Sequence, residues 1–288
     1  MTPKGEDAVL SIQSQVAYGH VGNSAATLPL QRLGFDVVPV NTVQLAHHPG
    51  HGSWCGHKLE PAQIARILDG VIRRGALGHC VAALSGYLGD AGVGAVVLDA
   101  VVALRAARPD AIYLCDPVIG DDGPGVFVSE GIPELMRDRL VPAADIVTPN
   151  RFELAFLAGR TVATLADARQ AAATLRARGP RLVVATSLAL PDDPDRLAVL
   201  ADDRDGSWLI ATPRLPVSIG GTGDAFSALF LGHYLRAGDV RRALERAVSA
   251  MFALVERTRA SGADELRLVA AQDEFDPATP RFRAQRLV

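Results

Sequence analysis

The chain has 288 residues, of which 49% are hydrophobic and 5% aromatic, so mainly aliphatic side chains can form a sizeable core. Its formal charge of −3 gives no electrostatic reason to expect a nucleic acid or an anionic membrane surface as a partner. The sequence shows neither a basic-then-apolar leader nor a run of about 18 apolar residues, and the default expectation is a soluble, cytoplasmic protein.

Hydrophobic patterns divide the chain into alternating strands and helices. Apolar runs predict strands at 8–13, 35–41, 79–84, 111–116, 145–148 and 181–186, with two more within 197–212 around Asp205-Gly206. Helical spacing predicts helices at 24–33, 59–74, 92–107, 149–157, 164–178 and 241–258, and a further one after Asp224. Strand, helix, strand in this order is a βαβ unit, which indicates a parallel sheet. No repeat or linker divides the chain, and we therefore expect one three-layer α/β/α domain over residues 1–288, with a mostly parallel central sheet.

The stretch 218–231, SIGGTGDAFSALFL, is the most informative part of the chain. A helix that is apolar on nearly every face is buried, so this helix should begin inside a cleft. Glycines would let a phosphate approach the free N–H groups at its start. Asp224 is then a negative charge where an anion should bind, and this makes sense if it takes a proton from a hydroxyl that attacks a phosphoryl group. The alternative is an ordinary helix start, where Asp is also favoured.

Polar residues follow several predicted strands at the ends where open parallel sheets bind ligands. They are Ser14, Asp116 to Asp121, Thr148 to Asn150 with Glu153, and Thr186 with Ser187. Each group alone could be a turn or a cap. Together they predict a site, in which Asp116, Asp121 and Glu153 offer the oxygen ligands that suit Mg²⁺ shared with nucleotide phosphates.

Several familiar motifs are missing from the sequence. It contains no GxxxxGK[ST] phosphate loop and none of the protein-kinase signatures. The stretch 89–94, GDAGVG, has glycine spacings in the wrong order for a dinucleotide fingerprint. Cys55, Cys80 and Cys115 have no metal-binding or CxxC spacing.

A histidine-rich segment runs from His47 to His57, and two interpretations remain open for it. It contains glycines and a proline, which favours a mobile loop over a small substrate. The alternative is a zinc site formed by the same histidines.

Seven stretches resemble pyridoxal kinases of the ribokinase-like superfamily. They are VLSIQS (9–14), YGHVGNSAA (18–26), VNTVQ (40–44), LSGYL (84–88), CDPV (115–118), DIVTPN (145–150) and GTGD (221–224). The last motif would specify only the superfamily, whereas the first three narrow the resemblance to the pyridoxal branch.

This resemblance implies a dimeric enzyme that transfers the γ-phosphoryl group of ATP to the 5′-hydroxymethyl group of pyridoxal, pyridoxine or pyridoxamine. Asp224 would be the general base, and Ser14, His48, Pro49 and Tyr87 would contact the vitamer. The nucleotide would lie against Asp116, Thr148, Glu153, Thr186, Ser187, Arg214, Val217, Gly221, Thr222 and Gly223. Asp121 and Glu153 would serve Mg²⁺, and Asp116, Thr148 and Thr186 would line a site for a monovalent cation such as K⁺.

The chain departs from the family pattern at His47-His48-Pro49, where many relatives carry Asn-His-Thr. Proline supplies neither the threonine hydroxyl nor a backbone N–H, so the preferred vitamer is left open. The alternatives are a hydroxymethylpyrimidine kinase or another small-alcohol kinase of the same superfamily, and a non-catalytic protein that binds a nucleotide or vitamer.

Overall fold

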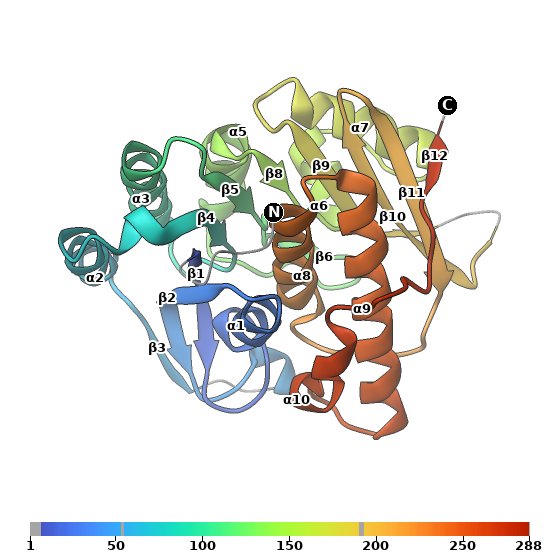
Figure 1. Ribbon diagram of the computed structural model, residues 1–288, viewed down its shortest axis with the longest axis horizontal. Helices are drawn as coiled ribbons and strands as arrows, with labels where there is room; N and C mark the ends of the chain where they lie inside the picture. The colour runs from blue at the N-terminus through green and yellow to red at the C-terminus, as the bar shows by residue number, and fades with distance from the viewer. Residues whose placement is uncertain (1–6, 53–54, 190–192, 288) are drawn as a thin grey trace.

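The computed structural model describes residues 7–52, 55–189 and 193–287 (Figure 1). The strands of its main sheet are β1 (Ala8–Val16), β2 (Asp36–Leu45), β3 (Gly56–Lys58), β4 (Cys80–Ser85), β5 (Ile112–Cys115), β8 (Ile146–Val147), β9 (Leu182–Ala189), β10 (Arg196–Asp203), β11 (Gly206–Pro213) and β12 (Gln285–Leu287). Their spatial order is β12-β11-β10-β9-β8-β5-β4-β1-β2-β3. The central pairs from β2 to β9 are parallel, and β3, β10, β11 and β12 add antiparallel edges. A small hairpin joins β6 (Gly120–Asp121) to β7 (Gly125–Val126).

Helices cover both faces of this sheet (Figure 1). One face carries α1 (Asn23–Arg32), α8 (Thr222–Ala237), α9 (Val240–Ala260) and α10 (Leu268–Ala271). The other face carries α2 (Pro61–Arg73), α3 (Val93–Ala107), α4 (Ile132–Leu135), α5 (Val141–Ala143), α6 (Arg151–Ala158) and α7 (Leu165–Arg176). Short helical turns are η1 (Pro49–His51), η2 (Ala76–His79), η3 (Met136–Leu140, a π-helix) and η4 (Gln272–Glu274).

Strand β1 shows why two cores form. Successive side chains of a strand point to opposite faces, so Leu10 and Ile12 join the cluster under α2 and α3, while Val9 joins the cluster under α1 and α8. Helix α8 is buried from Ala225 to His233, as its continuously apolar sequence predicts. It lies so close to α1 that a Cβ placed on Gly232 would be 2.6 Å from Leu33 Cδ1.

The structure confirms the predicted α/β class and the mostly parallel central sheet with helices on both sides. Several boundaries were wrong. β2 continues to Leu45 instead of ending at residue 41, and α6 begins at Arg151 because Asn150 is its N-cap. The edge strands β3 and β12 and the β6–β7 hairpin were missed, since they have two or three mostly exposed residues and no apolar period.

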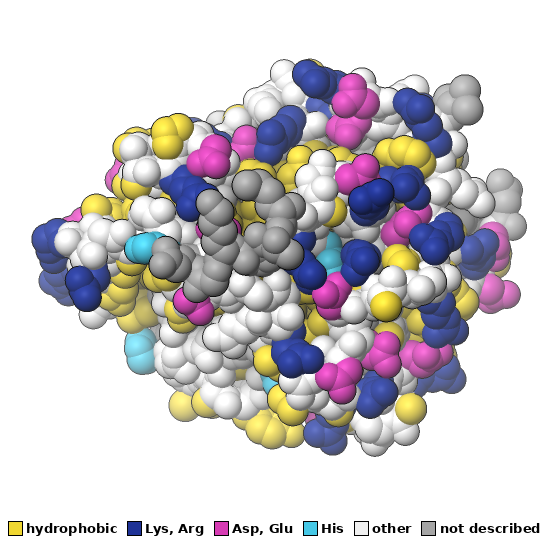
Figure 2. Space-filling model, in the orientation of Figure 1, with side chains coloured by type: hydrophobic (Ala, Val, Ile, Leu, Met, Phe, Trp, Pro, Cys, Tyr) yellow, Lys and Arg dark blue, Asp and Glu magenta, His cyan; other side chains and the backbone are white. Residues whose placement is uncertain are grey.

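Charged side chains of both signs are interspersed over α9 and the segment that follows it (Figure 2). Ion pairs there join Arg236 and Arg246 to Asp276, at 2.7 and 2.6 Å, and Arg281 to Glu256, at 3.0 Å. On the face shown, this mixing leaves no patch of a single sign over these elements that would attract a polyanion. None of the described helices is long and apolar enough to cross a membrane.

Candidate active site

Polar side chains from four parallel strands meet the start of α8 at the carboxyl edge of the sheet. Ser14 belongs to β1, Asp116 and Thr148 come directly after β5 and β8, and Thr186 lies within β9, where it pairs with Asn150. Gly221 precedes α8 with φ 81°, a conformation that glycine adopts without steric cost. No side chain caps the helix, which leaves its first N–H groups available to an anion.

Asp224 lies in the first turn of α8, partly buried. Burial raises the pKa of its carboxyl group, while a hydrogen bond from the backbone N–H of Gly22 and the nearby His48 favour the ionised form and limit the rise. A carboxylate of raised basicity beside free N–H groups can accept a proton from a bound hydroxyl.

The loop from Gly19 to Gly22 connects Asp224 to the strand that carries Ser14. A Cβ on Gly22 would lie 2.3 Å from Ser14 Oγ, and one on Gly221 would overlap the carbonyl oxygen of His20. Both glycines have positive φ, so the close approach and the backbone conformation each require glycine. Ser14 is 6% exposed, and only this loop separates it from Asp224.

A chain of hydroxyl groups links α8 to the ends of β5 and β8. The Ser227 hydroxyl donates to Asp116 Oδ2 at 3.0 Å and lies 2.8 Å from Thr148 Oγ1. Since Ser227 donates to the carboxylate, Thr148 donates to Ser227. Burial and the charges of Glu153 and Asp224 raise the pKa of Asp116 well above its ordinary value. Such a site favours a proton or a cation beside Asp116.

Glu153 is buried at the start of α6, where it forms a capping box with Asn150. Its two oxygens accept the backbone N–H groups of Ile119, at 3.0 Å, and Asn150, at 2.9 Å. Burial nevertheless raises the pKa of Glu153 to about 8. Because both oxygens already accept hydrogen bonds, Glu153 suits contact with a cation through water better than direct ligation.

The remaining nucleotide candidates line the outer part of this edge. Thr186 pairs with Asn150 in an isolated parallel bridge, and Ser187 is exposed with φ 55°, which is uncommon for a residue with a side chain. Asp121 and Arg214 are exposed, and Val217 is partly buried. The carboxylate of Asp121 is therefore open to a solvated ion.

The histidine-rich segment divides in the structure. His48 Nδ1 accepts the Gly50 N–H at 3.1 Å, and a Cβ on Gly220 would lie 3.4 Å from the same nitrogen, so His48 borders the glycine stretch before α8. Pro49 is exposed and begins η1. His57, by contrast, lies in the exposed edge strand β3 and is paired with Gln44. The predicted loop thus ends before His57, and its residues Ser53 and Trp54 lie outside the described residues.

Tyr87 follows β4 and packs against a small apolar cluster formed by Val16, Val21, Val43 and Leu45. Its partly buried ring faces the strands that lead to Ser14 and His48. Burial raises the pKa of its hydroxyl group, so the ring is neutral at physiological pH. This cluster can form an apolar wall for a flat heterocycle.

Sequence reasoning missed Ser227, which joins Asp116 to Thr148, and Gly22, which donates to Asp224. The glycine pair in Gly19-His20-Val21-Gly22 was the available signal for the loop. Ser227 has no such signal, because serine also occurs within apolar helices where it has no functional role.

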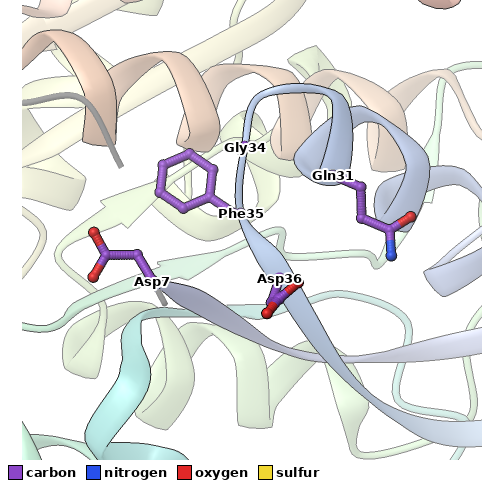
Figure 3. Close-up of a pocket in the computed structure, with 5 residues that line it drawn as sticks. All are labelled: Asp7, Gln31, Gly34, Phe35 and Asp36. Carbon is purple, nitrogen blue, oxygen red and sulfur yellow. The ribbon is translucent and has the colours of Figure 1, made fainter. Parts of the chain in front are cut away.

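Two hollows lie elsewhere on the described part of the chain, and neither is lined by Ser14, Asp116 or Asp224. The first, of about 370 Å³, is lined by Asp7, Gln31, Gly34, Phe35 and Asp36 at the amino ends of β1 and β2 (Figure 3). The second, of about 600 Å³, lies over α1 and β2 and includes Asn23 and Asn41. Because ligands of open parallel sheets bind at the carboxyl edge, the first hollow is at the wrong end for catalysis.

Comparison with known proteins adds an independent result. The pyridoxal kinase PdxY of Rubrobacter xylanophilus is 49% identical over 289 residues, covering 100% of both chains, and that of Deinococcus radiodurans is 50% identical over 294 residues, covering 100% of this chain and 99% of the relative. The chain belongs to the pyridoxal kinase family. The resemblance predicted from the motifs is therefore confirmed.

Other matches agree with this family. The family model for phosphomethylpyrimidine kinase matches residues 57–266. A solved pyridoxal kinase from Leishmania donovani, in complex with ADP and ginkgotoxin, superposes with a TM-score of 0.92 at 33% identity, covering 98% of this chain and 100% of that one. Two further complexes of that enzyme contain ADP with pyridoxamine or pyridoxine.

The described acidic residues at the edge of the sheet do not form a metal site by themselves. Among the described residues, no three His, Cys, Asp or Glu side chains gather closely enough to hold one. Asp116, Asp121 and Glu153 instead offer separate oxygen donors along the edge of the sheet. Such a set fits an ion that takes most of its ligands from nucleotide phosphates and water, which is how Mg²⁺ is commonly bound.

Proposed function

We propose that this chain transfers the γ-phosphoryl group of ATP to the 5′-hydroxymethyl group of pyridoxal, and also acts on pyridoxine and pyridoxamine. The observation that carries this proposal is Asp224, which lies in the uncapped first turn of α8 and is joined by one glycine loop to Ser14. Full-length identity near 50% to pyridoxal kinases supports the choice of acceptor.

Asp224 acts as the general base. The acceptor hydroxyl oxygen forms a bond to the γ-phosphorus while the bond from that phosphorus to the ADP oxygen breaks, and Asp224 takes the hydroxyl proton. The raised pKa of Asp224 makes it a better proton acceptor than an exposed aspartate. Ser14 and Tyr87 orient the pyridine ring, and His48 and Pro49 border the vitamer from η1.

The start of α8 receives the phosphate groups. The backbone N–H groups of Thr222 and Gly223 stabilise charge on the transferred group, as the positive end of a helix does for anions. We assign the nucleotide to the outer edge, against the residues Asp116, Thr148, Glu153, Thr186, Ser187, Arg214, Val217 and Gly221.

Two cations complete this proposal. Mg²⁺ near Asp121 and Glu153 supplies charge neutralisation at the phosphates when it is bound. A monovalent cation, K⁺ in the cell, fits the oxygens of Asp116, Thr148 and Thr186, and it would offset the cost of ionising buried Asp116. With Mg²⁺ present, replacing a bulky organic cation by K⁺ should raise activity; indifference to the exchange would remove the monovalent site.

A hydroxymethylpyrimidine kinase is the second candidate, and the matched phosphomethylpyrimidine kinase model favours keeping it. One assay separates the candidates: ATP consumption measured with pyridoxal, pyridoxine, pyridoxamine and hydroxymethylpyrimidine. We expect the highest kcat/KM with a B6 vitamer. Preference for hydroxymethylpyrimidine would reassign the substrate, and no turnover with any acceptor would favour a non-catalytic binding protein.

We also propose a single kinase domain that forms a homodimer in the cytoplasm, where ATP is the available phosphoryl donor. Two apolar cores share one sheet, which supports a single cooperative unit. Light scattering coupled to gel filtration tests the dimer, since a mass equal to one chain of 30.4 kDa would contradict it.

A further inference from the structure

The buried carboxylate of Glu265 lies far from Asp224 in the sequence but belongs to the same part of the fold. Glu265 follows α9 in the segment that leads to α10, and it is 8% exposed. Its neighbour Leu266 is fully buried, and Leu266 Cδ1 would lie 3.4 Å from a Cβ on Gly221. This C-terminal segment therefore packs directly behind the glycine that precedes α8.

The side chain of Glu265 holds the loop that contacts Asp224. Glu265 Oε2 accepts the backbone N–H of His20 at 3.0 Å. A Cβ on Gly19 would lie 2.5 Å from the carboxyl carbon and from both oxygens of Glu265. A bond to a charged acceptor is stronger than a neutral one, and the absence of a side chain at Gly19 provides the space for it.

The same loop makes three further contacts with the catalytic centre. The carbonyl of His20 abuts Gly221, Gly22 abuts Ser14, and the N–H of Gly22 donates to Asp224. With Gly19 at φ 95° and Gly22 at φ 55°, the loop contains two residues of unusual conformational freedom. Its position therefore depends on what its backbone groups bind.

We infer that Glu265 is a positioning residue for the kinase reaction, which acts through the Gly19–Gly22 loop to hold the Gly22 N–H on Asp224. This inference rests on the proposed function, in which Asp224 is the base. Glu265 does not touch the reacting atoms; it fixes a backbone donor that stabilises the ionised base.

The first test is kinetic. In Glu265→Ala the loop loses its anchor, so kcat should fall about tenfold or more, while KM for ATP stays within about threefold. Because the Gly22 N–H favours the carboxylate, its loss should also move the acid limb of the kcat profile to higher pH. The other groups whose charges face Asp224 and the loop are His48, Asp116, His20 and Arg267, and these side chains are kept in the variant. Loss of the Glu265 charge also lowers the pKa of His20, which that charge raises.

Two comparison variants separate positioning from stability. Glu265→Gln keeps an oxygen that accepts the His20 N–H, so it should restore kcat to within about threefold. Glu245→Ala is the matched control, because Glu245 is also buried, at 3% exposed, but anchors Arg241, Arg283 and the Ala284 N–H. It should lower the melting temperature and leave kcat and its pH profile unchanged.

Amide hydrogen exchange provides a readout that does not require activity. Residues 19–22 should exchange faster in Glu265→Ala than in wild type or in Glu245→Ala. Unchanged exchange together with a wild-type kcat and pH profile in Glu265→Ala would overturn the inference, and so would an equal kinetic loss in Glu245→Ala. If the wild type turned over no acceptor, the proposed function would fail and the catalytic role of Glu265 with it, while exchange would still report the anchoring of the loop.

Discussion

Asp224 illustrates how one carboxylate can be both basic and ionised. Burial raises the pKa of its carboxyl group and so favours the protonated form, whereas full exposure would leave it the weak basicity of an ordinary aspartate. The Gly22 N–H and His48 offset part of the cost of burial, so the carboxylate is retained beside the free N–H groups of α8. Its chemistry therefore depends on groups contributed by η1 and by the loop after β1.

Replacing Asp224 with asparagine should preserve shape and remove the proton acceptor. We expect Asp224→Asn to lower kcat by on the order of 10²–10⁴, the usual effect of losing a general base. Binding of ATP, measured by calorimetry, should change little because the backbone N–H groups of Thr222 and Gly223 remain. A variant that keeps near wild-type kcat would exclude Asp224 as the base.

The histidines of the 47–57 segment should differ in importance. His48 borders Gly220 and Asp224, whereas His57 lies in the exposed strand β3. We expect His48→Ala to raise KM for pyridoxal by about two- to twelvefold, the effect of one lost hydrogen bond, and His57→Ala to leave it unchanged. Steady-state kinetics on both variants tests this difference, and an equal effect would show that the two histidines act together.

At the scale of single residues, the chemical role of a side chain could be predicted from the sequence, but its contact partners could not. Asp224 and Asp116 follow glycine or strand signals that can be read directly. Ser227 contacts Asp116 from 111 residues away, and Glu265 contacts the backbone of His20 from 245 residues away. No local pattern marks such contacts. Only the packing of α8 and the C-terminal segment brings these groups together.

At the scale of elements, α8 has two functional ends. Its first turn presents Asp224, and its far end carries His233, which is 2% exposed and hydrogen-bonded through Nε2 to the Phe275 carbonyl at 2.8 Å. The long helices were predicted because their extended apolar periods determine them, whereas the short helices α4, α5 and α10 were missed. The short edge strands were not predicted either, since pairing partners define them more than their own residues do.

The buried His233 should make folding stability depend on pH. Burial lowers the pKa of His233 from 6.5 to about 4, with Asp276 opposing and Arg246 and Arg236 adding to the shift. Between these values the unfolded chain binds more protons, so this stability is complete above about pH 6.5 and is lost as pH falls towards 4. The loss should reach on the order of 3 kcal/mol.

Urea unfolding across this pH range measures the effect. His233→Gln keeps a donor for the Phe275 carbonyl but does not titrate, so its stability should vary less between pH 6.5 and 4 than that of the wild type. Parallel curves for the two proteins would mean that His233 does not contribute to acid sensitivity.

At the scale of the whole molecule, the candidate site lies at the carboxyl edge of the sheet that separates the two hydrophobic cores. Ser14, Asp116, Thr148 and Thr186 come from the sheet, and Asp224 comes from a helix on one face only. A ligand bound across them contacts elements of both hydrophobic clusters, so its binding should stabilise the entire fold. The mostly parallel sheet was predictable because βαβ order fixes it, whereas the loops at its edge depend on tertiary contacts.

Binding of the nucleotide should stabilise the whole protein. ATP with Mg²⁺ at about 100 times its Kd should stabilise the protein by about 2.7 kcal/mol, which raises the melting temperature by about 4–5 °C for a domain of 288 residues. Asp224→Asn should show the same rise, because it keeps the phosphate-binding backbone. Adding a chelator should reduce the rise if Mg²⁺ bridges the nucleotide to Asp121 and Glu153. Scanning calorimetry that found a single transition unmoved by saturating ATP and Mg²⁺ would contradict a nucleotide site at this edge, since the elements that form it also hold the two cores together.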